Sequence, residues 1–263
     1  MLCFSAFVPT NPILIPTIGK DHFDVIKKTR EALLALTKLL IEAIPTTLLF
    51  LSYPEKITEK YIIQIAPEYQ GNLEAFGDFA TKITRACDPV TAYKITRLTA
   101  QKFPLEITGA AALNHTVSVP LLTLTALLPN LPMLPIFASS LPLKDHFTLG
   151  QELQCPILRS HQKIAIIASG NLSYCQIKKS SEKNREKTQK FDQTILTLLN
   201  NKETEKLITL EPELLQEVQE TGLKTLSLIL GMLKGINYNP TILSYERSLG
   251  AGHLVVNFKL PKV

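Results

Sequence analysis

The chain alternates between short, uninterrupted apolar runs and longer segments whose apolar residues recur every three or four positions. The clearest run, residues 164–168, is rich in β-branched residues and bounded by polar ones. Such a run is typical of a strand with both faces buried in a sheet. Residues 46–51 and 131–138 have the same character. We therefore expect these segments to form central strands of one sheet.

Helical spacing is clearest over residues 20–43, where apolar positions fall on one face and Pro45 would end the helix. Strands and helices alternate along most of the chain, which is typical of a mainly parallel sheet. The predicted fold is α/β, a single domain over residues 1–263 with helices on both faces of the sheet. Further strands are expected at 1–8, 61–66, 241–245 and 253–258, further helices at 91–102, 121–128, 143–153, 191–200, 204–207, 212–219 and 222–235, and a loop at 71–78.

Polar residues follow several of the predicted strands. In open α/β sheets, ligands bind in the crevice beyond the carboxyl ends of the strands. The sequence therefore predicts a ligand-binding crevice at this edge. The alternative, which the residues alone leave open, is that each strand ends in an ordinary polar turn. The residues expected to line the crevice are Thr10, Asn11, Ser52, Tyr53, Asn114, His115, Asn171 and Tyr174.

The composition is that of a folded globular protein, with 45% hydrophobic and 19% charged residues. The net charge of +5 is small and the basic residues are interleaved with acidic ones, so nucleic acid is not an expected partner. The first strand lacks a basic signal-peptide region, and five prolines within 117–143 argue against a membrane helix there. The four cysteines form no Cys-x-x-Cys pair, so reduced thiols and a cytoplasmic location are expected.

Residues 176–190 form a charged segment, with six basic and two acidic residues between 178 and 190. We expect an exposed loop or lid. A basic module that binds phosphate or an acidic partner is the alternative, and it predicts salt-sensitive binding. No aromatic residue is interleaved with these charges, as a nucleic-acid patch would require.

Five motifs occur in a fixed order along the chain. They are Pro9-Thr-Asn-Pro-Ile-Leu-Ile-Pro16 with Ile18-Gly-Lys20, Gly77-Asp-Phe79, Asn114-His-Thr-Val-Ser-Val-Pro-Leu121, Ala168-Ser-Gly-Asn-Leu-Ser173, and Ser244-Tyr-Glu246 with Gly250-Ala-Gly-His-Leu-Val255. In this order the chain resembles the LigB-like class III extradiol ring-cleaving dioxygenases and their Memo-like relatives, which include a protein of the AmmeMemoRadiSam group.

The resemblance implies a site for non-haem ferrous iron, but most of its histidines are replaced here. The first metal-binding histidine of the family would fall at Thr10 or Asn11, and the second at Pro54. A further histidine, thought to act as acid or base, would fall at Tyr174, whereas His115 keeps the family histidine. The third ligand would fall near Glu220 or Thr221.

These replacements bear directly on the chemistry. Ferrous iron that binds a catecholate and dioxygen is held by two imidazoles and one carboxylate. Threonine and asparagine offer only weak neutral oxygens, and proline offers no side-chain ligand. A tyrosine, with its usual pKa near 10, is a poor base at neutral pH. We infer that the iron site is lost, and we expect no cofactor.

Two functional hypotheses follow. The first is a diverged, metal-free member of the superfamily that binds a small polar or aromatic ligand, or a protein partner, in the old active-site crevice, with His115 and Tyr174 as candidate catalytic residues. The second is an active dioxygenase that acts on a catechol-like aromatic and holds Fe(II) in a rebuilt site that uses His115 with Glu55 or Cys175. The sequence identifies neither the ligand nor the oligomeric state.

Overall fold

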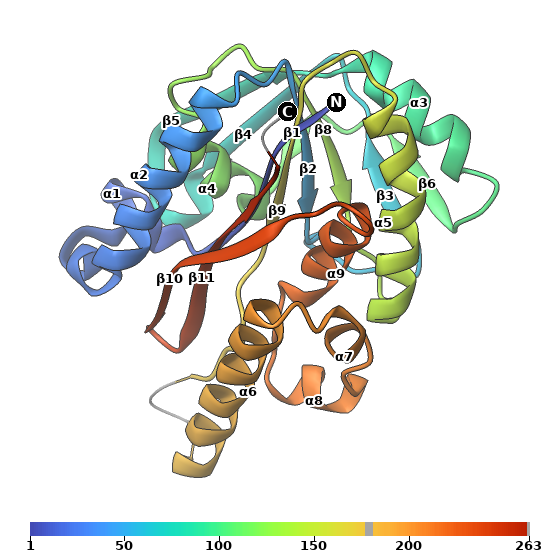
Figure 1. Ribbon diagram of the computed structural model, residues 1–263. Coiled ribbons are helices and arrows are strands. Elements are labelled where there is room, and N and C mark those ends of the chain that lie inside the picture. The colour runs from blue at the N-terminus through green and yellow to red at the C-terminus, as the bar shows by residue number, and fades with distance from the viewer. Residues whose placement is uncertain (177–180, 262–263) are drawn as a thin grey trace.

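The fold was obtained as a computed structural model that describes residues 1–176 and 181–261. A large mixed sheet has the strand order β10-β11-β1-β9-β2-β8-β3-β6, and a small sheet has the order β5-β4-β7 (Figure 1). Helices lie on both faces of the large sheet. The predicted single-domain α/β fold with a mainly parallel sheet is confirmed. No helix in these two ranges is long and apolar enough to cross a membrane.

The strands are β1 (Leu2–Val8), β2 (Thr47–Ser52), β3 (Tyr61–Gln64), β4 (Glu68–Leu73), β5 (Asp78–Ala86), β6 (Leu105–Thr108), β7 (Ala112–Leu113), β8 (Met133–Phe137), β9 (Ile164–Ser169), β10 (Asn239–Ser248) and β11 (Ala251–Lys259). The helices are α1 (Pro16–Gly19), α2 (Lys27–Glu42), α3 (Pro89–Thr99), α4 (His115–Leu124), α5 (Leu143–Leu158), α6 (Glu182–Asn200), α7 (Thr204–Ile208), α8 (Pro212–Glu217) and α9 (Leu223–Met232), with 3-10 turns η1 (Pro12–Leu14), η2 (Lys20–Ile26) and η3 (Glu74–Phe76).

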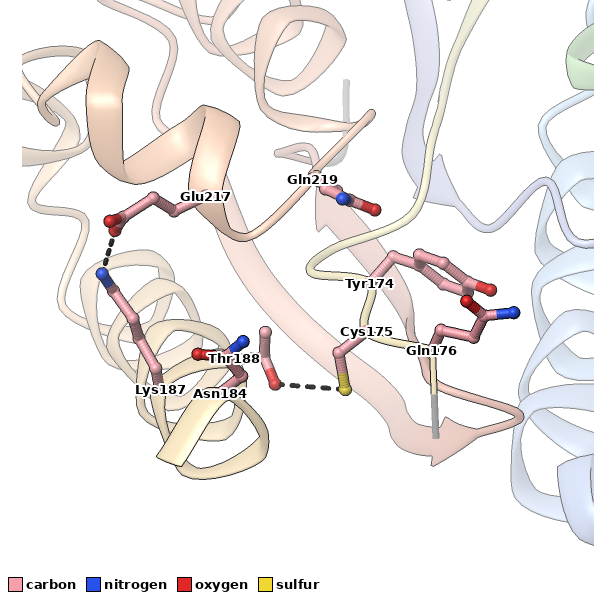
Figure 2. Close-up of a pocket in the computed structure, with 8 residues that line it drawn as sticks. All are labelled: Tyr174, Cys175, Gln176, Asn184, Lys187, Thr188, Glu217 and Gln219. Atoms are coloured by element: carbon pink, nitrogen blue, oxygen red, sulfur yellow. Dashed lines mark hydrogen bonds and ion pairs between the residues drawn. The ribbon is translucent and has the colours of Figure 1, made fainter. Parts of the chain in front are cut away.

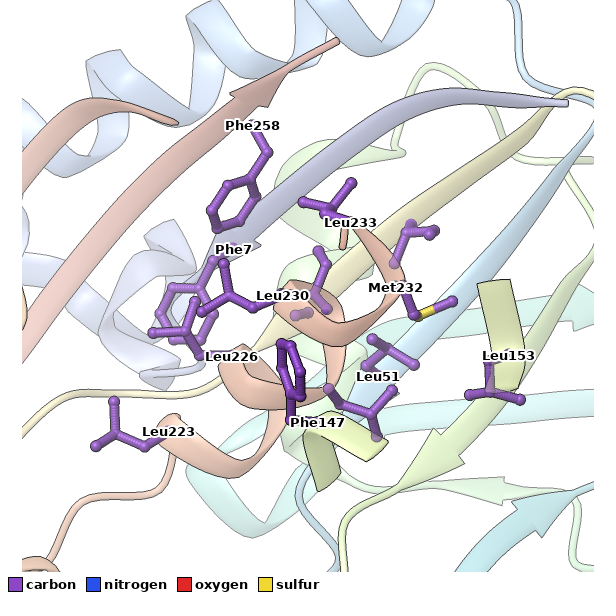
Figure 3. Close-up of a cluster of buried hydrophobic side chains, with 14 of the residues drawn as sticks. Phe7, Leu51, Phe147, Leu153, Leu223, Leu226, Leu230, Met232, Leu233 and Phe258 are labelled. Atoms are coloured by element: carbon purple, nitrogen blue, oxygen red, sulfur yellow. The ribbon is translucent and has the colours of Figure 1, made fainter. Parts of the chain in front are cut away.

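The four central strands, β1, β9, β2 and β8, run parallel and are buried on both faces. Alternate residues of β2 enter two separate cores, as a strand between two helical layers requires. Leu49 and Leu51 pack in the core that includes α5 and α9, which Figure 3 shows around Phe147. Leu48 and Phe50 pack in the core that includes α2 and α4.

The periphery of the sheet is antiparallel. The β10–β11 hairpin joins the sheet through β11, which pairs with β1, and β3 runs antiparallel to β8. The loop expected at 71–78 is wrong, because Glu68–Leu73 alternates buried and exposed residues and pairs with β5 as β4. Only the short η3 turn separates these two strands.

The charged segment is also partly corrected. Residues 177–180 of the expected loop or lid lie outside the described residues. From Glu182 onward the chain is helical, because Ser181 caps α6 by accepting a hydrogen bond from the Asn184 amide. Thr188, Asp192 and Ile195 are buried at helical spacing along one face of α6. The charged residues between Glu182 and Lys190 occupy its solvent side.

Helices α5 and α9 approach each other closely at two glycines. A Cβ built on Gly231 would overlap the carbonyl oxygen of Phe147, and a Cβ on Gly150 would overlap that of Leu228. Because these obstacles are backbone atoms, the helices themselves would have to separate. The close packing therefore depends on both residues lacking side chains.

We expect Gly231→Ala to lower the free energy of unfolding by about 1–3 kcal/mol through this overpacking. Urea unfolding followed by circular dichroism measures the change. Gly109→Ala is the matched control, since a Cβ there would meet nothing closer than 4.0 Å. Equal stability of the two variants would contradict the role given to the helix contact.

Two buried histidines predict acid sensitivity. Burial lowers the pKa of both His146 and His253 to about 4. His146 accepts a hydrogen bond from the Ser139 amide at Nε2, and its Nδ1 lies 2.9 Å from the Pro142 carbonyl oxygen, a pattern that fits the neutral ring. Unfolded histidines titrate near 6.5, so the unfolded state binds more protons between about pH 6.5 and 4.

The free energy of unfolding should therefore fall as pH is lowered through this window, by at most about 1.4 kcal/mol per pH unit for each of the two histidines. Urea unfolding at a series of pH values measures the slope. His146→Gln should reduce the slope, whereas His22→Gln, at an exposed position, is the matched control. Titration of the His146 imidazole near pH 6.5 in the folded protein would contradict the prediction.

Candidate functional site

The carboxyl ends of the central strands meet at one edge of the sheet, as the sequence predicts. Val8 is paired with Ser169, and Ser52 with Phe137, so the four strands end at the same level. Because the strands are rigid and buried, the residues that follow them are held in a fixed arrangement.

The buried floor of this edge is a set of hydroxyl groups that satisfy one another. The Ser52 hydroxyl lies 2.7 Å from that of Thr116, and the Ser169 hydroxyl lies 3.0 Å from Ser52 Oγ and 2.9 Å from the Thr116 carbonyl. Ser52 and Ser169 are fully buried. Ser52, expected to line the crevice, therefore belongs to its floor and offers no exposed atom to a ligand.

Above this floor, Thr10 and Asn171 bind each other. The Thr10 amide donates to Asn171 Oδ1 at 3.2 Å, and Asn171 Nδ2 donates to Thr10 Oγ1 at 3.1 Å. The backbone amide of Asn171 also donates to the Thr221 hydroxyl. Asn11 begins η1, because its Oδ1 accepts from the Ile13 amide. The segments that follow β1 and β9 are thus joined by a reciprocal hydrogen-bonded pair.

Asn114 is the N-cap of α4 and His115 is its first residue, so the helix expected at 121–128 begins earlier and ends at Leu124. Asn114 Nδ2 donates to the Tyr53 carbonyl at 3.0 Å. The half-buried His115 ring packs edge-on against Phe76, with 5.2 Å between ring centroids. Burial lowers the pKa of His115, and the Glu55 carboxylate partly opposes this. The imidazole is therefore neutral at pH 7 and can accept a hydrogen bond.

A cavity of about 270 Å³ lies beside this part of the site. Glu55 and Asn114 line it together with Phe137 at the end of β8. The charged and amide groups stand against an apolar wall, which is the usual composition of a small-molecule site.

Tyr53, Glu220 and Lys224 form a second polar group at the same edge. Glu220 Oε2 accepts from the amides of Gly222 and Leu223 at the start of α9. Burial raises the pKa of Glu220. The pKa of Tyr53 is also raised, mainly by burial and to a lesser extent by the Glu220 charge. Burial lowers the pKa of Lys224, which the Glu220 charge opposes.

Lys224 is the residue of this group that sequence reasoning missed as a site residue. Its Nζ donates at 2.8 Å to the carbonyl of Ser139, which follows β8. The available signal was a lysine in the first turn of an otherwise apolar helix. Without the position of α9 against the strand ends, that signal pointed to an ordinary exposed lysine.

Tyr174 and Cys175 lie elsewhere, in a pocket of about 420 Å³ shown in Figure 2. None of the other predicted crevice residues lines this pocket. Tyr174 is 40% exposed and bridges to Ala251 of the β10–β11 hairpin. The structure thus gives Tyr174 surroundings different from those of His115. The lining residues are Tyr174, Cys175, Gln176, Asn184, Lys187, Thr188, Glu217 and Gln219.

Cys175 is buried against an ion pair that ties α6 to the hairpin. Arg247 Nη1 lies 2.8 Å from Asp192 Oδ2, and Arg247 Nη2 lies 3.2 Å from Cys175 Sγ. The Tyr245 hydroxyl donates to Asp192 as well. The thiol is therefore engaged with the hairpin, and it does not line the cavity that Glu55 lines.

Several oxygens at the strand ends accept hydrogen bonds within the protein. Thr10 Oγ1 accepts from Asn171 Nδ2, Asn171 Oδ1 accepts from the Thr10 backbone amide, and Glu220 Oε2 accepts from two backbone amides. Within residues 1–176 and 181–261, no three His, Cys, Asp or Glu side chains gather closely enough to hold a metal ion. The donor set differs in kind from two imidazoles and a carboxylate.

Comparison with known proteins agrees with the fold. Protein CA_C1420 of Clostridium acetobutylicum is 21% identical over 267 residues, which cover 96% of this chain and 56% of that protein. The chain thus spans about half the length of this curated relative. The uncharacterized protein JW3007 from Escherichia coli K12 is similar in structure, with a TM-score of 0.64 at 17% identity, covering 97% of this chain and 99% of that one.

Residues 6–256 match the family described as the catalytic LigB subunit of aromatic ring-opening dioxygenase. This match covers nearly the whole sheet, from β1 to β11, and all the strand-end segments. The chain therefore belongs to the LigB family of aromatic ring-opening dioxygenase catalytic subunits.

Proposed function

We propose that this chain is a diverged LigB-family member that binds a small polar or aromatic ligand at its strand-end crevice without ferrous iron. The observation that carries the proposal is the reciprocal pair of Thr10 and Asn171. Thr10 stands just after the end of β1, where the family resemblance would place the first metal-binding histidine at Thr10 or Asn11, and Asn171 follows the neighbouring strand β9. The Thr10 hydroxyl accepts a hydrogen bond from Asn171, and a neutral hydroxyl is a weak replacement for an imidazole.

The remaining groups suit ligand binding. The neutral His115 ring can accept a hydrogen bond from a ligand hydroxyl, and Phe76 beside it offers an aromatic edge. Asn114 and Glu55 line the adjoining cavity of about 270 Å³, which suits a single-ring compound. A hydroxylated aromatic ring matches both the polar and the apolar parts of this surface.

An active ferrous dioxygenase with a rebuilt site is the second candidate. The observation in its favour is that the Glu55 carboxylate lies near enough to the His115 ring for its charge to raise the pKa of the imidazole, against the larger effect of burial. Cys175, the third residue considered for such a site, lines the other pocket. The rebuilt site would therefore have to draw its remaining ligands from elsewhere.

Metal binding separates the two candidates. We expect protein purified without oxygen to hold far less than one iron per chain and to show no saturable, high-affinity uptake of Fe(II), because the donors are mutually bonded. Elemental analysis and anaerobic titration measure this, with His115→Ala as the comparison variant. One tightly bound iron per chain that is lost in His115→Ala, together with oxygen uptake on catechol, would establish the second candidate instead.

Catechol is a suitable probe of the crevice. We expect catechol to bind saturably without added metal, as measured by isothermal titration calorimetry. We expect no ring opening. His115→Ala should weaken this binding about tenfold through loss of one hydrogen bond and of ring contact. His22→Ala, at an exposed position, is the matched control. Unchanged affinity in His115→Ala, or an absence of saturable binding, would contradict the proposed ligand class.

A further inference from the structure

A third cavity, of about 360 Å³, lies on the face of the sheet that α2 and α4 cover. It is bounded by η1, the start of α1, η2, α2, one residue of β5, and α4, and α1, α2 and α4 lie on the same side of the molecule in Figure 1. Its lining shares no residue with the strand-end cavity or with the pocket beside Tyr174. The lining residues are Leu14, Ile15, Pro16, Phe23, Arg30, Leu33, Leu34, Thr81, Leu122 and Thr123.

The walls of this cavity are mostly apolar. Leu14, Ile15 and Leu33 are buried members of the adjoining core, so they form a fixed base. Leu34 stands at the rim and is 61% exposed. Together with the preformed apolar hollow, it adds to the apolar surface that a ligand in this cavity could cover.

One cation faces this apolar surface. The half-buried Arg30 guanidinium carbon lies 3.3 Å from the centroid of the Phe23 ring, so the planar group stacks on the aromatic face. Over the described part of the chain, Arg30 has no ion pair or hydrogen bond with an acidic side chain. Its N–H groups are therefore available to a planar anion, which a guanidinium binds through two parallel hydrogen bonds.

The other polar groups of the lining already donate their protons within the protein. The Thr81 hydroxyl donates to Asp78 at 2.7 Å, and the Thr123 hydroxyl donates to the carbonyl of Val119 or Pro120. Asp78 also accepts from Thr17 and from two backbone amides, and these bonds hold its pKa at about 2, so it stays negative. A negative ligand group is thus repelled near Thr81, and among the residues that line this cavity Arg30 is the cation that attracts it.

We propose that this cavity binds a small monocarboxylate with an apolar body, such as a medium-chain fatty acid. The carboxylate pairs with Arg30, and the hydrocarbon chain covers Leu33, Leu34 and Leu122. The site is separate from the strand-end crevice, so the inference does not depend on the proposed function.

Decanoate, used below its micelle concentration, tests the proposal by isothermal titration calorimetry on the full chain. We expect one saturable site, with 1-decanol binding at least tenfold more weakly because it lacks the charge. Arg30→Gln should weaken decanoate about tenfold and leave decanol nearly unchanged. Arg97→Gln is the matched control, because it removes an exposed arginine in the last turn of α3, outside the lining.

Three results of these titrations would each overturn the proposal: no saturation by decanoate, equal binding of decanoate and decanol, or equal affinities of Arg30→Gln and Arg97→Gln. Leu34→Glu, at an exposed position, gives a second variant that should weaken both ligands without unfolding the chain. Concentration-dependent dimerisation that Leu34→Glu abolishes would show that a second copy covers this face, and would replace the small-ligand site.

Discussion

The burial of both faces of β1, β9, β2 and β8 is the constraint on which the rest of the structure depends. A strand enclosed by two helical layers can carry almost no polar side chain along its length. Apart from Ser5 in the middle of β1, the serine and threonine residues of these four strands are therefore found at the strand ends. Ser52 and Ser169 are the last residues of their strands, and they meet Thr116 in a buried set of hydrogen bonds. The polar edge follows directly from the apolar interior.

A close backbone approach extends this edge beyond the strands. A Cβ on Gly170 would fall within 3 Å of backbone atoms of Thr221 and Gly222, so the turn after β9 can lie directly against the start of α9. This contact allows Asn171 and Thr221 to exchange hydrogen bonds. It also brings the Glu220 carboxylate, just before α9, near enough to Tyr53 for its charge to raise the pKa of the tyrosine. The charge of Glu220, late in the chain, thus acts on Tyr53, which follows β2 in the first quarter of the chain.

The sequence predicted the features that depend on local periodicity, such as β9 and the helix that includes α2, because each must bury a continuous apolar surface. Features that depend on distant pairing were not accessible. No local pattern encodes the bridge that draws Tyr174 toward Ala251. On α6, the buried Asp192 carboxylate is satisfied by Arg247 and Tyr245, both more than fifty residues later, and a pattern of hydrophobic residues cannot detect such a face. Lys224 was missed for the same reason, since its environment is set by residues outside its own helix.

The proposed loss of iron is compatible with retention of the fold for a physical reason. The positions where the resemblance would place the metal ligands follow the strands and contribute little to either hydrophobic core. Replacement of residues at these positions therefore leaves the cores intact. A metal ion at this edge would also hold the strand-end loops together. The Thr10–Asn171 pair joins the segments after β1 and β9 by two hydrogen bonds, and Asn114 joins the start of α4 to the Tyr53 carbonyl. Hydrogen bonds between the chain's own side chains and backbone thus hold the edge in place, while Glu55 stays exposed and His115 only half-buried.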